Sequence, residues 1–268
     1  MPAPEPRFAR YGGNTSCVAL AHDGEPPSLV LDAGTGLRVL STMLGSEPFV
    51  GSILLGHVHL DHILGLPFFP AAERPGGSVQ VYVPSQGDPV EVLGRVLSPP
   101  TFPLRPDELR GDWRFHSLEP GHHRVAGFDV LALEVPHLAG RMFGYRISDP
   151  TATITYVSDH SPILVGEGPD GLGARHTNAL ALARDTDMLI HDAQHVADEF
   201  PAKAFLGHSC VEYALDLGRL AGARKVMLFH HDPGRGDDEL DAIVATARAD
   251  SPIPVVAAVE GAVHDLLK

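Results

Sequence analysis

Short hydrophobic runs separated by turn residues organise the first third of the chain. Two β-branched and apolar runs, TSCVALA and SLVLDAG, flank the turn-like HDGEPP and predict two strands. Helical spacing of apolar residues appears in TGLRVLSTMLG, which ends at Gly45, and a continuous apolar run typical of a buried strand appears in SILLG. This part of the chain is therefore predicted to contain strand, strand, helix and strand, in that order.

Strands dominate the middle of the chain and alternate with helices in the last third. The middle strands are predicted at VQVYVPS, WRFHSLEPG, FDVLALEVPH, FGYRIS and TITYVSDH. The last third predicts a helix near TNALALARD, a strand at DMLIHDA, a helix in HSCVEYALDLGRLAG, a strand at KVMLFHH and a helix in DDELDAIVATARA. Two runs of strands with interspersed helices favour an α/β fold layered as an αββα sandwich. No linker divides the chain, so residues 1–268 are predicted to form a single domain.

Composition and charge narrow the classes of function. Apolar residues make up 44% and charged residues 20%, as in ordinary globular proteins. No apolar span reaches about 20 residues, and the start, MPAPEPRFAR, lacks the apolar core of a signal peptide, so we expect a cytoplasmic protein without membrane association. The formal net charge of -14 repels nucleic-acid backbones. A small anionic substrate is therefore favoured over a long nucleic acid.

Cysteine usage limits the kinds of metal site that the chain can form. Cys17 and Cys210 are its two cysteines, too few for a disulfide framework and without the paired spacing of a thiolate zinc site. Ligands of any bound metal would therefore be histidine and aspartate.

Three histidines and one aspartate occur within six residues directly after the strand predicted at SILLG. His57 and His59 are two residues apart, so their side chains share one side of an extended segment. Asp61 and His62 follow where the chain turns into a helix, which lets them face a second point nearby. The alternative is a solvated polar turn. Four potential ligands between a buried strand and an apolar helix favour a site for two adjacent metal ions.

Polar residues also end three later apolar strands. His137 ends FDVLALEVPH, Asp159 ends TITYVSD and His230 ends KVMLFH. Strand ends are where α/β layers usually build their sites. His231, the neighbour of His230, is the alternative ligand because the register of that strand is ambiguous.

These residues together resemble the metallo-β-lactamase-fold hydrolases, over nearly the whole chain from GGNTSC to LFHHDP. The family pattern HxHxDH is matched by the first cluster, and the later ligand positions are matched at the three strand ends. The resemblance implies a four-layer αββα sandwich of two mixed β-sheets flanked by helices, two divalent metal ions per chain and a homodimer. The implied ligands are His57, His59 and His137 for one ion, Asp61, His62 and His230 for the other, with Asp159 bridging them.

Such a donor set suits Zn²⁺, Mn²⁺ or Fe, and a pair of these ions can bridge a hydroxide that attacks a phosphoryl or carbonyl group. Asp32 in LVLDAGTG resembles the aspartate that orients a ligand histidine in this family, and its alternative role is a cap for the helix starting at Thr35. The other histidines, among them His191 and His195, show no comparable placement and are expected to be surface or structural residues.

Within this family, GHSCVEYALDLGRLAG followed by KVMLFHHDP resembles the phosphodiesterase branch, which includes tRNase Z and the phosphoribosyl cyclic phosphate phosphodiesterases. The resemblance implies three catalytic residues: Asp61, His208 as the general acid that protonates the leaving oxygen, and Asp192 as its carboxylate partner. A plain N-terminal helix position is the alternative for His208.

The spacing between two ligand positions points to the size of the substrate. tRNase Z has a long tRNA-gripping arm between the third histidine and the bridging aspartate. The 22 positions from His137 to Asp159 leave no room for one. A small, cyclic phosphodiester is therefore the expected substrate.

Two other functions use the same ligand set. The first is hydrolysis of lactones or of thioesters, as in enzymes related to glyoxalase II, with His208 in a structural role. The second is a metal-stabilised binding or sensor protein without turnover.

Overall fold

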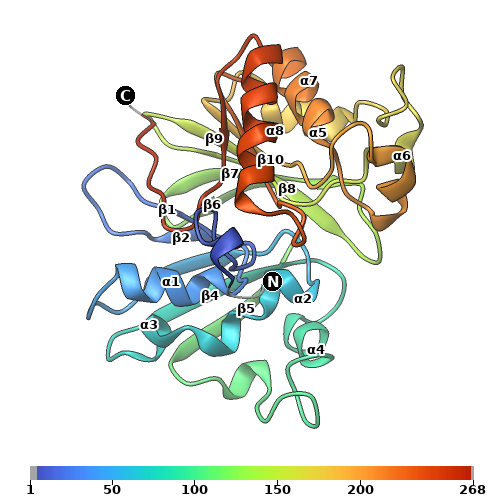
Figure 1. Cartoon of the computed structure of the whole chain (residues 1–268). Coiled ribbons are helices and arrows are strands. Elements are labelled where there is room, and N and C mark those ends of the chain that lie inside the picture. Colours follow the sequence, from blue (N-terminus) through green and yellow to red (C-terminus); the bar gives the residue numbers. More distant parts are fainter. Residues whose placement is uncertain (1–4, 267–268) are drawn as a thin grey trace. The chain divides into compact units, whose positions relative to one another are not determined.

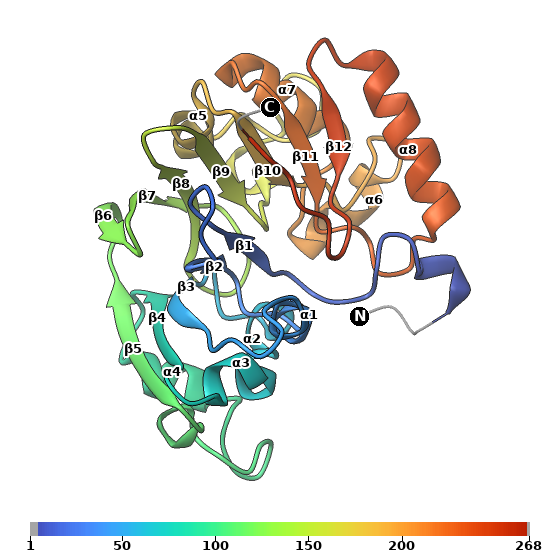
Figure 2. The same ribbon diagram turned by 90° about the vertical axis from the view of Figure 1, so that its left-hand side faces the viewer.

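The computed structural model describes residues 5–266 and divides into two compact units. The N-terminal unit contains residues 15–119 and 124–127, and the C-terminal unit contains the remaining described residues. Each unit is built around one β-sheet with its own helices (Figures 1 and 2).

The sheet of the N-terminal unit has five strands in sequential order. They are β1 (Val18–Leu20), β2 (Leu29–Leu31), β3 (Val50–Leu54), β4 (Ser78–Pro84) and β5 (Asp112–Leu118). β1 pairs antiparallel with β2, and the other neighbours pair in parallel. All of β2 and the second half of β3 are buried, as their continuous apolar sequences predict.

Four short helices accompany this sheet: α1 (Gly36–Met43), α2 (Leu60–Ile63), α3 (Pro70–Glu73) and α4 (Pro89–Gly94). Leu37 and Leu40 of α1 lie in one core cluster with Val30 of β2 and Ile53 of β3. Their three-residue spacing places both leucines on the face of α1 that meets the sheet. The start of α4 is fixed by Asp88, whose side chain accepts the backbone N–H three residues later at 3.0 Å.

The sheet of the C-terminal unit has seven strands in the order β12-β11-β10-β9-β8-β7-β6. They are β6 (Gly121–Val125), β7 (Phe128–Val135), β8 (Met142–Ser148), β9 (Thr153–Val157), β10 (Met188–Asp192), β11 (Val226–Phe229) and β12 (Val255–Ala257). β7, β8 and β9 are antiparallel neighbours, whereas β9 to β12 pair in parallel. β7, β9, β10 and β11 therefore run in one direction, and their carboxyl ends meet at one edge of the sheet.

The helices of this unit are α5 (Thr177–Ala183), α6 (Phe200–Lys203), α7 (Val211–Ala221) and α8 (Asp237–Asp250). Leu182 of α5 and Leu217 of α7 join the core formed with Val157 and Leu189 of the sheet. Gly218 permits the close approach of α7, because a Cβ at this position would lie 2.5 Å from a methyl group of Val226.

Two mixed β-sheets flanked by helices are the predicted fold class, which is thereby confirmed. The sequence patterns predicted neither β6, whose sequence GHHRV is polar, nor β12, which has three residues. The single domain predicted for residues 1–268 stays a prediction. Between residues 5 and 266, no helix combines the length and apolar character needed to cross a bilayer.

An ion-pair network joins α6 to the loop that follows β11. Glu199 accepts hydrogen bonds from Lys203 at 2.6 Å and from the buried Arg235, and Lys203 also reaches Asp232 at 3.2 Å. Partial burial alone would raise the pKa of Glu199, but the bonds from Lys203 and Arg235 outweigh it and lower that pKa to about 2. The charged form of Glu199 is therefore the stabilising one.

Glu199→Gln is expected to lower the free energy of unfolding by about 1–2 kcal/mol at pH 7. Because the folded-state pKa lies below the unfolded value, this contribution is present above about pH 4.5 and is lost as the pH falls toward 2. Urea denaturation of both proteins at pH 7 and pH 3.5 measures the difference. Glu239→Gln, which removes a more exposed partner of Arg235, is the control and should cost under about 0.5 kcal/mol. An equal loss for Glu199→Gln at both pH values would contradict the charge-based account.

Candidate metal centre

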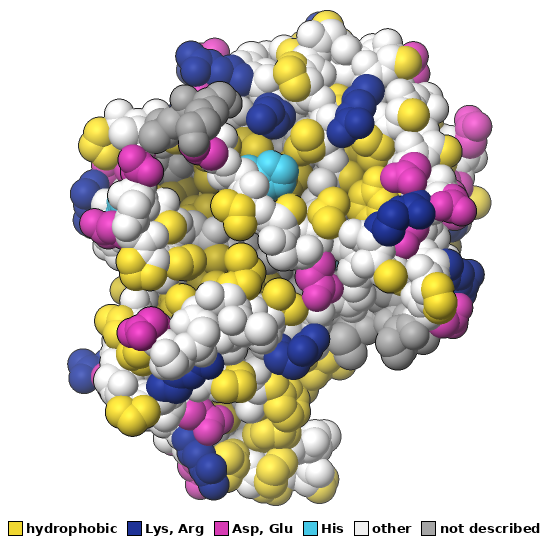
Figure 3. Space-filling model, turned by 60° about the vertical axis from the view of Figure 1, so that its left-hand side comes forward, with side chains coloured by type: hydrophobic (Ala, Val, Ile, Leu, Met, Phe, Trp, Pro, Cys, Tyr) yellow, Lys and Arg dark blue, Asp and Glu magenta, His cyan; other side chains and the backbone are white. Residues whose placement is uncertain are grey.

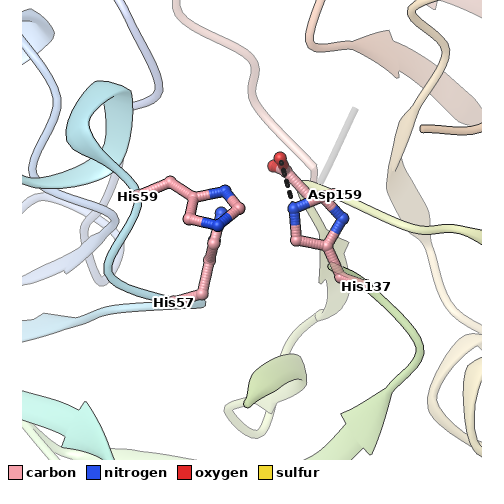
Figure 4. A group of neighbouring side chains, drawn as sticks. All are labelled: His57, His59, His137 and Asp159. Carbon is pink, nitrogen blue, oxygen red and sulfur yellow. Dashed lines mark ion pairs between the residues drawn. The ribbon is translucent and has the colours of Figure 1, made fainter. Parts of the chain in front are cut away.

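The N-terminal unit holds a compact group of imidazole rings just after β3. His59 has extended backbone angles and precedes the first residue of α2, so the rings of His57, His59 and His62 gather at the junction between strand and helix. Ring centroids lie 4.3 Å apart for His57 and His59 and 4.2 Å apart for His57 and His62. Figure 4 shows the rings of His57 and His59 side by side. Each of these imidazole rings can offer a nitrogen lone pair to a metal ion when it is neutral.

A buried carboxylate, that of Asp32, orients one of these rings. Asp32 follows β2 and accepts the backbone N–H of Gly56 at 2.6 Å and a hydrogen bond from Nδ1 of His62 at 2.7 Å. A carboxylate only accepts, so Nδ1 of His62 carries the proton and Nε2 holds the lone pair. The nearest carboxylate oxygen of Asp61 lies 3.2 Å from that Nε2. The geometry favours the role of orienting a histidine over that of a helix cap.

In the C-terminal unit, candidate ligands follow β7, β9 and β11 at the shared edge of the sheet. The buried Asp159 carboxylate points one oxygen toward Nε2 of His137 and the other toward Nε2 of His230, each at 3.6 Å. The first of these contacts is the dashed line in Figure 4. Nδ1 of His137 donates to the carbonyl of Gly207 at 2.8 Å, which leaves the Nε2 lone pair facing the carboxylate. The two oxygens of Asp159 thus face two different histidines.

The two neighbouring histidines His230 and His231 have different surroundings within this unit. Nε2 of His231 donates to the carbonyl of Ala258 at 3.1 Å, its ring packs edge-on against Tyr11, and burial lowers its pKa to about 4. His230, in contrast, has a left-handed backbone with φ of 56° and turns its ring toward Asp159. The geometry therefore favours His230 over His231 as a ligand.

Gln194 holds the far side of the His230 ring. Its amide nitrogen lies 3.0 Å from Nδ1 of His230. An amide turned by 180° would present its oxygen instead and place the proton on Nδ1, as ligation through Nε2 requires. The rotamer of Gln194 thus controls the tautomer of His230.

Asp192, at the end of β10, is a second buried carboxylate with several donors. One oxygen accepts the backbone N–H of Gln194 at 3.1 Å. The other accepts the backbone N–H groups of His160 at 2.9 Å and Ser209 at 3.1 Å. It also accepts Nδ1 of His208 at 3.1 Å. These donors fix Asp192 as an acceptor and the proton of His208 on Nδ1.

His208 lies beside the candidate ligands of its own unit. Its ring stacks on that of His230 at 4.8 Å, and its Nδ1 lies 3.7 Å from Asp159. Potential ligand atoms of these three residues lie within 4.8 Å of one another. Two roles fit this position: a proton donor held by Asp192, or a third ligand.

The sequence patterns did not connect His191 with this group. It was expected to be a surface or structural residue, and it is buried, with its Nδ1 donating to the backbone carbonyl of Asp192 at 2.7 Å. The available signal was its place in the apolar strand LIHD, where an imidazole needs buried partners.

The sequence profile of the β-lactamase superfamily domain matches residues 28–231. The chain belongs to this superfamily. The matched segment contains Asp32 and every candidate ligand from His57 to His230. Ribonuclease Z of Natronomonas pharaonis is 24% identical over 254 residues, which cover 81% of each chain.

Solved structures of other proteins share the fold of this chain. The metallo-β-lactamase fold protein YhfI of Bacillus subtilis superposes with a TM-score of 0.69 at 20% identity, covering 94% of this chain and 92% of that one. The short form of human tRNase Z gives a TM-score of 0.66 at 19% identity, covering 97% and 96%. The predicted family, fold and enzyme class, a metal-dependent hydrolase of the metallo-β-lactamase fold, are confirmed. The ligand assignments, the identity and number of the metal ions, the homodimer and the cytoplasmic location stay predictions.

The donor sets fit divalent metal ions. Each unit offers imidazole nitrogens together with a carboxylate, a combination that binds Zn²⁺, Mn²⁺ or Fe. His62 and His137 are both held by hydrogen bonds at Nδ1, so each offers the Nε2 lone pair. Two of the candidate ligands are thus already in the tautomer that metal binding requires.

Asp32→Asn is expected to weaken binding of divalent metal ions by about 10- to 100-fold, because the ring of His62 loses its charged acceptor. Asparagine tolerates the left-handed backbone of this position, where φ is 60°. Competition for Zn²⁺ against a fluorescent chelator measures the affinity. Asp23→Asn, in the exposed turn between β1 and β2, is the matched control. Equal affinities of Asp32→Asn and the wild type would show that Asp32 does not support a ligand.

Proposed function

We propose that the protein is a dinuclear metal-dependent phosphodiesterase that cleaves a small, cyclic phosphodiester. One ion would be bound by His57, His59 and His137, the other by Asp61, His62 and His230, with Asp159 between them. Membership of the β-lactamase superfamily over a segment that contains all seven residues supports this assignment.

When bound, two divalent ions supply an activated water and polarise the phosphoryl group. The residues of the chain position these components. Asp159 directs one oxygen toward His137 and one toward His230. Asp32 keeps His62 in one orientation from behind. Asp159, Asp32 and His62 are buried, so these contacts within each unit are in place before substrate arrives.

The contact between Asp192 and His208 is the observation that carries the proposal. Asp192 holds the proton of His208 on Nδ1, so the ring can give and take a proton at Nε2. Hydrolysis of an alkyl phosphodiester expels an alkoxide, which leaves only when it is protonated. A thiolate leaves readily without a proton. A histidine held in this way is therefore more useful to a phosphodiesterase than to a thioester hydrolase.

Charge and chain length support a small substrate. The net charge is -14, and on the face drawn in Figure 3 the described Lys and Arg side chains are scattered among Asp and Glu. Such a surface lacks the basic track that grips a nucleic-acid backbone. The segment between His137 and Asp159 is taken up by β8 and β9 and their short connections. Because relatives of the chain are named ribonuclease Z, RNA serves as the comparison substrate in the tests below.

The first test measures metal-dependent hydrolysis of bis(4-nitrophenyl) phosphate. Protein loaded with Mn²⁺ or Zn²⁺ should cleave it, and Asp159→Ala should lose at least about 100-fold in kcat/KM together with one of the two ions. Metal content is read by elemental analysis of the same samples. Turnover of a lactone or thioester in place of any phosphodiester, with both ions bound, would refute the proposal. A short RNA cleaved faster than cyclic nucleotides would refute its small-substrate part.

The second test separates the two roles of His208. His208→Ala is expected to slow hydrolysis of 2′,3′-cyclic AMP by about 10²- to 10⁴-fold, because its leaving group is a sugar hydroxyl that needs a proton. Hydrolysis of bis(4-nitrophenyl) phosphate should fall by less than about tenfold, since 4-nitrophenolate leaves unprotonated. Metal content should not change. Loss of an ion, with an equal fall for both substrates, would identify His208 as a ligand instead.

A further inference from the structure

A pair of buried histidines lies behind the Asp192–His208 contact. His191 precedes Asp192 in β10, so its side chain points to the opposite face of the sheet. Its Nδ1 lies 2.7 Å from the backbone carbonyl of Asp192, and its Nε2 lies 3.0 Å from Nδ1 of His160. The backbone N–H of His160 in turn bonds the Asp192 carboxylate at 2.9 Å. These three contacts close a ring of hydrogen bonds around residue 192.

The hydrogen bonds determine where each proton lies. The carbonyl of Asp192 only accepts, so Nδ1 of His191 carries a proton and its Nε2 is an acceptor. Nδ1 of His160 must then be the donor to that Nε2. Burial lowers the pKa of both rings, which agrees with one proton on each. The pair therefore has a single hydrogen-bonding arrangement.

The pair is also fixed by packing. Tyr213 of α7 places its buried ring 5.3 Å from that of His160 and 5.8 Å from that of His191, measured between centroids. The Tyr213 hydroxyl lies 3.2 Å from the carbonyl of Ala174, to which it donates. Neither histidine ring can turn without disturbing the core between the sheet and α7.

We propose that His191 and His160 are positioning residues: they hold Asp192, and through it His208, in the geometry for proton transfer to the leaving group. Residue 192 is held at its carbonyl by His191 and at its carboxylate by the backbone of His160. Because His160 directly follows Asp159, the same pair also fixes the peptide next to the candidate bridging carboxylate. This inference rests on the proposed function.

Three variants separate positioning from simple packing. His191→Phe keeps a ring in the core but removes both hydrogen bonds, whereas the amide of His191→Gln can still donate to Asp192 and accept from His160. Tyr213→Phe keeps the ring against the pair, removes the two hydrogen bonds of its hydroxyl, to the Ala174 carbonyl and from the His176 N–H, and is the control. Thermal unfolding and metal content are measured for all of them.

His191→Phe should lower kcat for 2′,3′-cyclic AMP by about 10- to 100-fold with KM within about twofold, and should lower kcat for bis(4-nitrophenyl) phosphate by less than about threefold. His191→Gln should recover most of the loss, and Tyr213→Phe should behave like the wild type. Equal losses on both substrates, or no loss on either, would overturn the positioning role. Should His191→Phe not fold, His160→Phe breaks the same pair from its other side.

Proton exchange measured by NMR needs no catalytic activity, so it tests this inference separately from the proposed function. The Nδ1 proton of His208 should give a downfield resonance in nitrogen-15 correlated spectra, protected from exchange by its bond to Asp192. His191→Phe should accelerate that exchange at least about tenfold, and His191→Gln should not. Unchanged exchange in His191→Phe would overturn the inference even in an active enzyme. Accelerated exchange in a protein that cleaves no phosphodiester would retain the positioning of Asp192 and refute the proposed function.

Discussion

The candidate site of the C-terminal unit depends on the hydrogen bonds made by the buried carboxylate of Asp192. Moving an unpaired carboxylate out of water costs several kcal/mol, so its burial requires donors that are fixed in advance. Backbone N–H groups of His160, Gln194 and Ser209 supply them from three separate segments. Those segments are the loop after β9, the loop after β10 and the loop before α7. The charge of Asp192 therefore holds together the loops that carry the candidate site.

The N-terminal unit uses the same device with a different carboxylate. Asp32 also follows a strand, is buried, and accepts one backbone N–H and one imidazole Nδ1. Both Asp32 and His230 adopt left-handed backbone angles, which costs a residue with a side chain about 1–3 kcal/mol. Such strain persists only where other contacts determine the position. In these two residues it turns a polar side chain from the strand end toward its partner.

The sequence predicts the parts of this arrangement that depend on periodicity. An apolar run ending in a polar residue located His137, Asp159 and His230, because parallel strands bring their carboxyl ends to one edge. The partners of those residues are not encoded locally. Asp32 and His62 are 30 positions apart in the sequence, and His160 and His191 are 31 positions apart. Whether such pairs meet depends on strand register and loop length, which hydrophobic spacing does not determine.

The strands that escaped prediction also have physical causes. β6 pairs at the edge of its sheet, where the polar residues His122 and Arg124 are exposed, so no apolar run marks it. β12 is too short for its pattern to differ from that of a loop. Neither strand carries a candidate ligand.

His62 and His208 each have a carboxylate contact at Nδ1. One is a candidate metal ligand and the other a proposed proton donor, and the two side chains differ in their access to water. The side chain of His62 is fully buried, with its Nε2 beside Asp61 and the other imidazoles. The side chain of His208 is 13% exposed. A ligand needs only a constant lone pair, whereas a proton donor must be recharged from solvent after each turnover. The same hydrogen bond therefore suits the candidate ligand His62, whose ring is buried, and the proposed proton donor His208, whose ring meets water.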